Sequence, residues 1–513
     1  MIGSPGAMLA PMIRVFRLYN HMAPPVSSAP PATSSPVPNF HPRRMLLSLV
    51  EGPNLLAAVK VVSQDTLLRS LGLVSAVNLL DGVGILIVPN EAVPGRPYFL
   101  QTTWGLYFSK DLPDGIVAVI VARVRVLLFG RVQEIGRMPQ RYIHVLAREG
   151  KGSGRERRSI GLPEPEAPPP FLKADLDQLA RAAYCPDWHR KTLTAEKLSL
   201  SGRTPVRIAV LDSGVDLGHP SLGSFVTAAT ISYTDKACHG THITSIISAK
   251  EIGSSPAEPD YTKSGYQIKW VPAGLLPGTP ITFYKVMNDA VLPLTKSNGS
   301  YWYPVDPNAY LAALAQLLIA QMKTGASALV INLSVGGKAP FSTEASLLKD
   351  LVKWGALPVA ASGNHDVNST ALPPVLYPAA LPSCASIGAY RLEMYSASYP
   401  PYSWEGTNEV GPVGSSRPSL SRQPVDFYSP GRNILAALPI SPTQPQVRPY
   451  CDYLTGTSMA TAFASAALAY WINQGRFSGP DLPNSAAAWA KSAFVPLLGN
   501  SVFIGNRRRA SSL

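Results

Sequence analysis

Cysteine is scarce in this chain, with only four residues in 513. Cys185, Cys238, Cys384 and Cys451 lie far apart, and no two of them form a Cys-x-x-Cys pair. Disulfide frameworks and zinc ribbons require closely spaced or numerous cysteines. The sequence therefore predicts neither, and its cysteines leave the redox compartment open.

Long apolar runs are also missing. No stretch supplies the ~20 uninterrupted apolar residues that a membrane-spanning helix needs. Residues 115–130 come nearest, but Arg123 and Arg125 alternate with valines there, and this alternation favours a strand. The first 13 residues lack a basic start and contain Pro5 and Pro11, so no secretory signal is predicted. We expect no membrane span and a cytoplasmic protein.

Acidic residues are few, and the formal net charge is +13. Residues 1–205 carry 24 Lys and Arg against 15 Asp and Glu. A nucleic-acid-binding arm is one interpretation of this excess, and it would require steeply salt-dependent binding. The basic residues are scattered along the chain, which favours an ordinary solvated surface. We expect no nucleic-acid partner.

Proline, by contrast, is abundant: 50 residues, about twice the average usage of ~5%. Together with the apolar pattern it divides the chain into five segments. These are a disordered Pro-rich segment (1–42), a small α/β or mostly β unit (43–148), a Pro-rich linker (149–170), a large domain (171–500) and a basic tail (501–513). We find no internal repeats.

Short strand-like runs alternate with helix-like segments after residue 171. The strand-like runs are 206–211, 281–286, 328–333, 357–361 and 384–388. A helix is predicted to begin at Asp306-Pro307 and to stop at Gly325, because these residues are typical helix boundaries. The alternation predicts a mostly parallel sheet with helices on both faces. Active sites in such sheets lie at the carboxyl ends of strands, where Asp212 and Asn364 both fall.

Three polar side chains stand in the order Asp212, His239, Ser458. A serine hydroxyl becomes a nucleophile near neutral pH only if a base accepts its proton and a carboxylate orients that base. Each residue alone has a plainer interpretation: a turn residue for Asp212, a core histidine for His239 and a helix cap for Ser458. The local sequences around them favour the catalytic interpretation.

Eight segments carry a family resemblance in the right order. They are Ala209-Val210-Leu211-Asp212-Ser213-Gly214, His239-Gly240-Thr241-His242, Val271-Pro272-Ala273-Gly274, Val330-Ile331-Asn332-Leu333-Ser334-Val335-Gly336-Gly337, Ala361-Ser362-Gly363-Asn364, Tyr377-Pro378-Ala379, Ser429-Pro430-Gly431 and Gly456-Thr457-Ser458-Met459-Ala460. Over roughly 205–475 the chain resembles the subtilisin-like serine proteases, or subtilases. The resemblance implies a subtilisin-like fold and an enzyme that hydrolyses polypeptides through an acyl-enzyme intermediate.

The resemblance also implies a role for individual residues. Asp212, His239 and Ser458 would form the triad, and Asn364 would help to form the oxyanion hole. Two segments would bind substrate: Ser334-Val335-Gly336 as a pairing strand, and Ala361-Ser362-Gly363 as a wall of the S1 pocket. Leu376 near the base of that pocket, His365 near its rim and the lack of a nearby carboxylate favour an apolar P1 residue. The family likeness predicts a cis peptide bond at Tyr377-Pro378.

Several alternatives remain open. A catalytically silent, peptide-binding relative is the second functional hypothesis. Residues 43–148 are either a cleaved pro-domain or an accessory module. The aromatic residues within 288–304 form either a cleft edge or a plain surface loop. Cys238, His239 and His242 are metal-ligand types, but no fourth ligand is evident, so no metal site is predicted. We expect no cofactor, although relatives bind structural calcium whose ligands cannot be assigned here, and we expect a monomer.

Overall fold

The structure is a computed structural model, and it describes most of the chain in separate ranges. These are residues 32–33, 38–49, 55–79, 103–145, 198–202, 204–230, 232–253, 271–289, 291, 293–296, 301–324, 328–365, 374–391, 402–403, 425–432, 434–440, 451–496 and 502–507. The predicted linker 149–170 and most of the predicted segment 1–42 lie outside the described residues.

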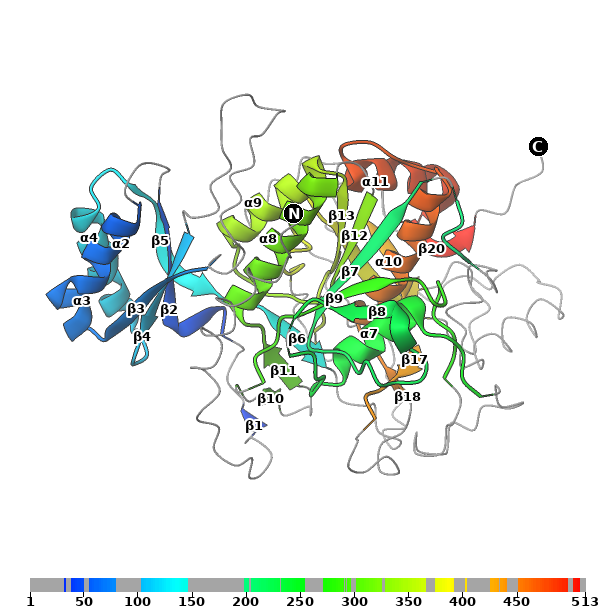
Figure 1. Ribbon diagram of the computed structural model, residues 1–513, viewed down its shortest axis with the longest axis horizontal. Coiled ribbons are helices and arrows are strands. Elements are labelled where there is room, and N and C mark those ends of the chain that lie inside the picture. The colour runs from blue at the N-terminus through cyan, green and yellow to red at the C-terminus, as the bar shows by residue number, and fades with distance from the viewer. Residues whose placement is uncertain are drawn as a thin grey trace, which may run out of the picture.

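A large, mostly parallel sheet forms the centre of the molecule (Figure 1). Eight strands run parallel in the order β8 (Val226–Ala228), β9 (Ile281–Lys285), β7 (Val206–Asp212), β12 (Ala328–Leu333), β13 (Ala356–Ala361), β14 (Ala385–Arg391), β16 (Phe427–Pro430) and β20 (Val502–Arg507). The antiparallel strands β15 (Tyr402–Ser403) and β19 (Phe494–Pro496) pair with β14 and β20. All five predicted strands are present. Strand β20 lies within the segment predicted as a basic tail.

Helices cover both faces of this sheet, as the alternating pattern predicts (Figure 1). Helices α7 (His239–Ser248) and α10 (Thr457–Asn473) pack on one face, and α8 (Pro307–Thr324) and α9 (Ser342–Lys353) pack on the other; α11 (Leu482–Ala493) lies near β13, β19 and β20. The Asp306 carboxylate accepts the N–H groups of Asn308 and Ala309 at 2.8 and 3.3 Å, so the predicted helix start is confirmed. Among the helices described, none is both long and apolar enough to cross a bilayer.

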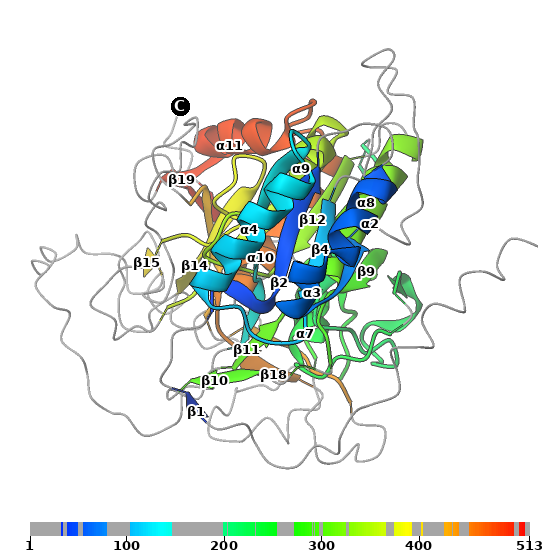
Figure 2. The same cartoon turned by 90° about the vertical axis from the view of Figure 1, so that its left-hand side faces the viewer.

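A second, smaller sheet precedes the large one along the chain. Its antiparallel strands run in the order β3 (Leu73–Asn78), β4 (Thr103–Phe108), β2 (Phe40–Leu49) and β5 (Val132–Pro139). Helices α2 (Leu55–Gln64), α3 (Thr66–Ser70) and α4 (Asp114–Leu127) lie over one face of this sheet (Figure 2). We call β2 to β5 with these helices the N-terminal unit. It begins at Phe40, three residues before the predicted boundary.

The strand predicted around Arg123 and Arg125 was wrong, because this segment is helix α4. Ile120 and Val124 are fully buried, while Val126 is 68% exposed. In a strand Val124 and Val126 would face the same side, whereas in a helix they point apart. Nearly every residue here is apolar, so the sequence fits both the helical period of about 3.6 residues and the strand period of two. Packing of one helical stripe onto the sheet decides between them.

Two smaller sheets complete the described structure. In the first, β1 (Ala32–Thr33), β10 (Leu294–Lys296), β11 (Tyr301–Pro304) and β6 (Tyr142–Val145) are neighbours in that order. Strand β6 follows the N-terminal unit, whereas β10 and β11 belong to the large domain. The second is a hairpin-like pair of β17 (Ile434–Ala437) and β18 (Cys451–Leu454). Within the described part of 288–304, β11 pairs with β6, and β10 pairs with β11.

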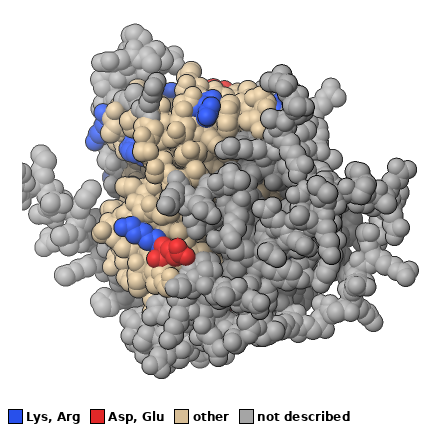
Figure 3. Space-filling view, turned by 90° about the vertical axis from the view of Figure 1, so that its right-hand side faces the viewer, with Lys and Arg blue, Asp and Glu red and all other residues tan. Residues whose placement is uncertain are grey.

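The described surface drawn in Figure 3 is largely uncharged. Lysine and arginine side chains stand apart from one another on it, and one basic group lies beside an acidic one. Nucleic-acid sites present clustered basic side chains. The described part of this face therefore shows no such cluster; the face lies opposite the N-terminal unit, so the expectation for residues 1–205 stays a prediction.

Candidate active site

Asp212 and His239 form a buried pair at the carboxyl end of β7. Asp212 is the last residue of β7, and His239 is the first residue of α7; both are fully buried. Asp212 Oδ1 lies 2.7 Å from His239 Nδ1 and also accepts the Ser213 N–H at 2.7 Å. Because an ionised carboxylate can only accept, Nδ1 carries a hydrogen, and Nε2 is the nitrogen that accepts a proton when the ring is in its neutral form.

A second buried carboxylate, Asp235, holds the start of α7 against the end of β7. Its Oδ1 accepts the Ser213 hydroxyl at 2.7 Å, and its Oδ2 accepts the Thr241 N–H at 2.8 Å. The Ser213 oxygen in turn accepts the Gly240 N–H at 3.0 Å. Burial raises the pKa of Asp235, and the hydrogen bonds from Thr241 and Ser213 oppose this rise. Asp235 was not predicted as a site residue; its position four residues before His239 was the available signal.

Glycine is required directly after His239. A Cβ atom at Gly240 would meet the backbone oxygen of Gly214 and the ring of Phe283. The absence of a side chain lets α7 approach the end of β7 closely enough for the Asp212–His239 contact. The His239-Gly240 dipeptide thus has a packing reason in addition to a chemical one.

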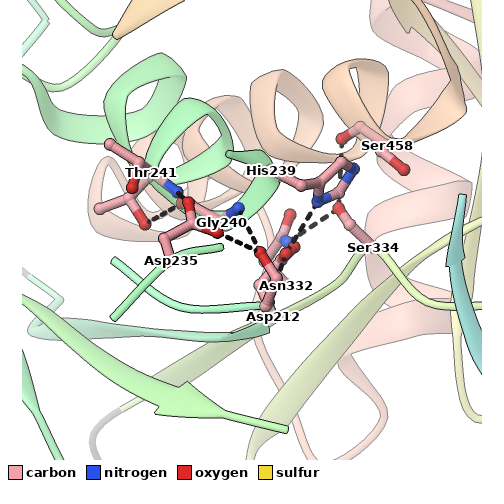
Figure 4. Close-up of polar contacts among 10 residues, drawn as sticks. Asp212, Asp235, His239, Gly240, Thr241, Asn332, Ser334 and Ser458 are labelled. Atoms are coloured by element: carbon pink, nitrogen blue, oxygen red, sulfur yellow. Dashed lines mark hydrogen bonds and ion pairs between the residues drawn. The ribbon is translucent and has the colours of Figure 1, made fainter. Parts of the chain in front are cut away.

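Ser458 lies in the first turn of α10, next to the imidazole of His239. Figure 4 shows the ring of His239 between Asp212 and Ser458, so the structure brings the three predicted residues together. Among the described residues, His239 Nε2 has no hydrogen-bond partner, so Ser458 and His239 are not hydrogen-bonded in this arrangement. Such bonds are often long in ligand-free sites and tighten with substrate. The start of a helix also favours negative charge near Ser458.

Asn364 follows β13 and is held by the residue before Ser458. Its Oδ1 accepts both the N–H and the hydroxyl of Thr457, at 2.8 and 2.9 Å. These two bonds fix the orientation of the amide, and they direct its acceptor end toward the start of α10. The NH2 group is then the end of the amide that can donate a hydrogen bond to a ligand. Asn364 lines the same pocket as Ser458.

That pocket gathers most of the predicted substrate-binding residues. It is lined by Tyr142, His144, Trp302, Ser334, Val335, Gly336, Ala361, Gly363, Asn364, Leu376, Thr457 and Ser458. Ser362 was predicted to line it but does not: it is fully buried, and its backbone bonds to Ile387 and Leu376 at 2.9 and 2.8 Å. No acidic side chain is among the lining residues.

Strand β6 of the same chain lies along this pocket, between Gly336 and β11. We call the space that it occupies the cleft. Tyr142 of β6 exchanges two backbone hydrogen bonds with Gly336, both 2.9 Å long. On its other edge β6 pairs antiparallel with β11, with His144 opposite Trp302 and Tyr142 opposite Pro304. Strand β6 is therefore an added strand between the predicted substrate-pairing segment and the 288–304 segment. No role was predicted for Tyr142–Val145, since nothing in these four residues themselves indicates what they pair with.

His144 lies in the cleft among groups that disfavour its charged form. Burial, together with the nearby His239, lowers its pKa to about 3. Neither ring nitrogen of His144 has a hydrogen-bond partner among the described residues. His144 is consequently neutral in this arrangement.

The other predicted features lie as follows. The Tyr377-Pro378 peptide bond is cis, as predicted. His242 directs Nε2 to the carbonyl oxygens of Ile434 and Asp452, at 3.1 and 3.2 Å. Within the described ranges, no group of three or more His, Cys, Asp or Glu side chains has the arrangement of a metal site.

Comparison with known proteins agrees with this geometry. The sequence pattern of the subtilase family (Peptidase S8) matches residues 203–481, which is more than half of the chain. The chain therefore belongs to the subtilase family.

Similar proteins include subtilisin NAT of Bacillus subtilis subsp. natto, 27% identical over 307 residues that cover 58% of this chain and 63% of that protein. The major intracellular serine protease of Bacillus subtilis is 24% identical over 52% of this chain and 67% of that protein. The chain thus spans less than two thirds of the length of the subtilisin NAT sequence it matches. Among solved structures, fervidolysin from Fervidobacterium pennivorans, a keratinolytic enzyme related to subtilisin, matches with a TM-score of 0.51 and 18% identity. That match covers 86% of this chain and 56% of fervidolysin and extends the fold likeness into the N-terminal unit.

Proposed function

We propose that this protein is a serine endopeptidase in which Asp212, His239 and Ser458 act as the catalytic triad. One observation carries the proposal: the 2.7 Å bond between Asp212 Oδ1 and His239 Nδ1, which orients the ring so that its other nitrogen, Nε2, is on the side away from the carboxylate, where Ser458 lies (Figure 4). A peptide-binding protein has no need of a buried carboxylate that orients an imidazole in this way. The membership of the subtilase family supports the same assignment.

The proposed reaction uses side chains and backbone groups only. His239 Nε2 takes the hydroxyl proton of Ser458 as its oxygen attacks the carbonyl carbon of the scissile peptide. The Asn364 NH2 group and the Ser458 N–H stabilise the oxyanion that forms. His239 then gives the proton to the departing amine, and an acyl-enzyme remains. Water, activated by the same nitrogen, releases the acid and restores the serine.

The substrate is proposed to bind as an extended strand along Ser334-Val335-Gly336. Strand addition of this kind supplies backbone hydrogen bonds, and specificity comes from pockets for individual side chains. Val335, Ala361 and Leu376 give the pocket beside Ser458 an apolar character. We therefore expect apolar P1 residues to be favoured over basic ones.

The N-terminal unit is proposed to act as a pro-domain. Strand β6 lies where we expect the substrate, and it leads into the predicted linker 149–170. Cleavage after β6 would separate the N-terminal unit from the large domain. N-terminal sequencing of the purified protein tests this point: a start within the stretch after Val145 supports a pro-domain, and an intact N-terminal unit on active enzyme favours an accessory module.

A fluorophosphonate probe tests the main proposal. The probe reacts only with a serine whose hydroxyl is activated by a neighbouring base. We expect one label, on Ser458, that is absent in Ser458→Ala and retained in Ser465→Ala, a buried serine two turns later on the same helix. An unlabelled wild-type protein that still binds peptides would instead support the catalytically silent alternative.

A further inference from the structure

Three aromatic rings meet in the cleft beside the catalytic residues. The rings of Trp302 and His144 are stacked, with centroids 3.9 Å apart and planes 19° apart. Tyr142 meets Trp302 edge-on, at 5.9 Å and 79°. All three side chains line the pocket that contains Ser458 and Asn364.

The strand pairing explains why these rings share one face. Trp302 and His144 are directly opposite in the antiparallel pair β11–β6, so their side chains leave the same side. Tyr142 is two residues from His144 and therefore faces that side too. Ile143 faces the other side, where it is fully buried in the main core against Tyr303. A peptide that replaced β6 in the same register would present alternate residues to Trp302.

The contact with His144 depends on the flat face of the ring and not on hydrogen bonds. Neither nitrogen of His144 has a partner among the described residues, and no acidic side chain lines the pocket. Burial of an unpartnered polar atom opposes binding. A benzene ring in the same place would keep the stacking and avoid this cost.

We infer that Trp302 is a specificity-determining residue, and that the cleft selects extended peptides with an aromatic side chain at the residue facing Trp302 and a second ring two residues before it. This inference rests on the proposed peptidase function and names its substrate class. It also makes β6 a weaker occupant of the cleft than a peptide with phenylalanine in place of His144, because phenylalanine has no polar ring atom to bury.

Hydrogen exchange in the full chain carrying Ser458→Ala tests the ring preference without any catalysis. The readout is exchange of the β6 amides, including the Tyr142 N–H that bonds to Gly336. Aromatic pairs contribute enough to change the opening of β6 by about three- to tenfold. We expect His144→Ala to speed exchange by about that factor and His144→Phe to slow it.

Trp302→Ala should remove this dependence on residue 144, so that the alanine, histidine and phenylalanine forms exchange within about twofold of one another. Tyr301→Ala, one residue away and on the opposite face of β11, should leave the differences in exchange rate among the three residue-144 forms unchanged. The inference is overturned if the spread persists without Trp302, or if His144→Phe exchanges as fast as His144→Ala.

Cleavage of added peptides tests the substrate class. Peptides of the form Tyr-Ile-x-Val, with x as Phe, His or Ala, are offered to the wild-type chain and to Trp302→Ala. We expect Phe to exceed Ala by about tenfold in kcat/KM for the wild type, and the ratio to fall to about two in Trp302→Ala. Equal ratios in the two proteins overturn the inference. If no peptide is cleaved while exchange still depends on Trp302, the ring preference stands and the peptidase function fails.

Discussion

The two main sheets of this molecule bury their strands by different means. In the large domain, β12 and β13 are buried at every position, because the helices of that domain cover both faces. In the N-terminal unit, helices α2, α3 and α4 cover one face only, and Met45, Leu47 and Leu49 of β2 lie beneath them. The other face turns to the large domain, where Leu46 joins the main core. The large domain covers both faces of its sheet with its own helices, whereas the second face of the sheet in the N-terminal unit is covered by the large domain.

This shared layer contains polar contacts as well as the apolar contacts of Leu46, Leu79 and Met138. The Tyr107 hydroxyl donates to Asn308 at 2.8 Å, and the hydroxyls of Thr103 and Thr343 are 3.4 Å apart. A contact surface of this kind resembles a separable interface more than the interior of a domain. The difference between the sheets suits an N-terminal unit that is ordered on the large domain and can be detached from it.

Asp212→Asn should produce the largest effect and lies wholly in the large domain. An amide in place of the carboxylate favours the wrong tautomer of His239 and cannot stabilise the imidazolium, so kcat should fall by about 10⁴-fold. Peptide hydrolysis with an active-site titration measures it. Asp235→Asn is the matched change, because Asp235 bonds to Ser213 and Thr241 but not to the imidazole. Its main effect should be a lower unfolding temperature, with a much smaller loss of kcat than in Asp212→Asn. Equal losses of kcat in both variants would contradict these separate roles.

Arg141→Met should loosen the junction between the two regions. Arg141 and Glu344 are 2% and 0% exposed, and their side chains are joined by contacts of 3.0 and 2.5 Å. Burial opposes the charge of Arg141, but Glu344 outweighs it and raises the pKa of Arg141. Loss of one partner leaves a buried charge unpaired, so the free energy of unfolding should fall by about 3–5 kcal/mol.

Urea denaturation of the full chain with Ser458→Ala measures this loss. The double variant Arg141→Met, Glu344→Leu should regain most of it, because no buried charge remains. Lys353→Met breaks an exposed pair with Asp350 and should cost less than about 1 kcal/mol. A double variant as unstable as Arg141→Met would show that the charge is not the cause.

Val124→Asp compared with Val126→Asp tests the helix in the N-terminal unit. Val124 is fully buried and Val126 is 68% exposed, so the first change should lower the free energy of unfolding by about 3 kcal/mol and the second by less than about 0.5 kcal/mol. Thermal unfolding of both variants measures the difference. Equal effects would fit the strand that alternation predicts and would refute α4.

The smallest expected effect is that of acidification, which should weaken the contact of β6 with the cleft. The pKa of His144 is lowered to about 3 in the cleft, chiefly by burial and then by His239, and a solvated histidine has a pKa near ~6.5. Between these values the released strand binds more protons, so retention of β6 is fully favoured above pH ~6.5 and weakens as the pH falls toward 3.

We expect β6 amides of the Ser458→Ala chain to open about thirtyfold more readily at pH 5 than at pH 7.5, after correction for intrinsic exchange. His144→Phe has no titrating ring and should show little of this change. If the phenylalanine form shows the same pH dependence, another group is responsible.

Much of the large domain could be predicted because its rules are local. A strand buried on both faces can be predicted from a short apolar run, and a helix start such as Asp306-Pro307 can be predicted from two adjacent residues. The residues of the site were found for the same reason, since each lies at a strand or helix end within a short characteristic segment. Ser362 and Asp235 were misjudged or missed, because pocket lining and hydrogen-bond partners depend on neighbours distant in sequence.

By itself the sequence determined that Asp212 and Asn364 would follow strands of a parallel sheet and that Ser458 would lie at a helix start, because apolar period and turn chemistry act over a few residues. Only the tertiary structure decided that α4 is a helix, that Arg141 pairs with Glu344, and that Tyr142–Val145 lies in the cleft against Trp302. Those outcomes depend on contacts between residues more than 150 positions apart or on the layer that covers a segment. No local pattern carries that information.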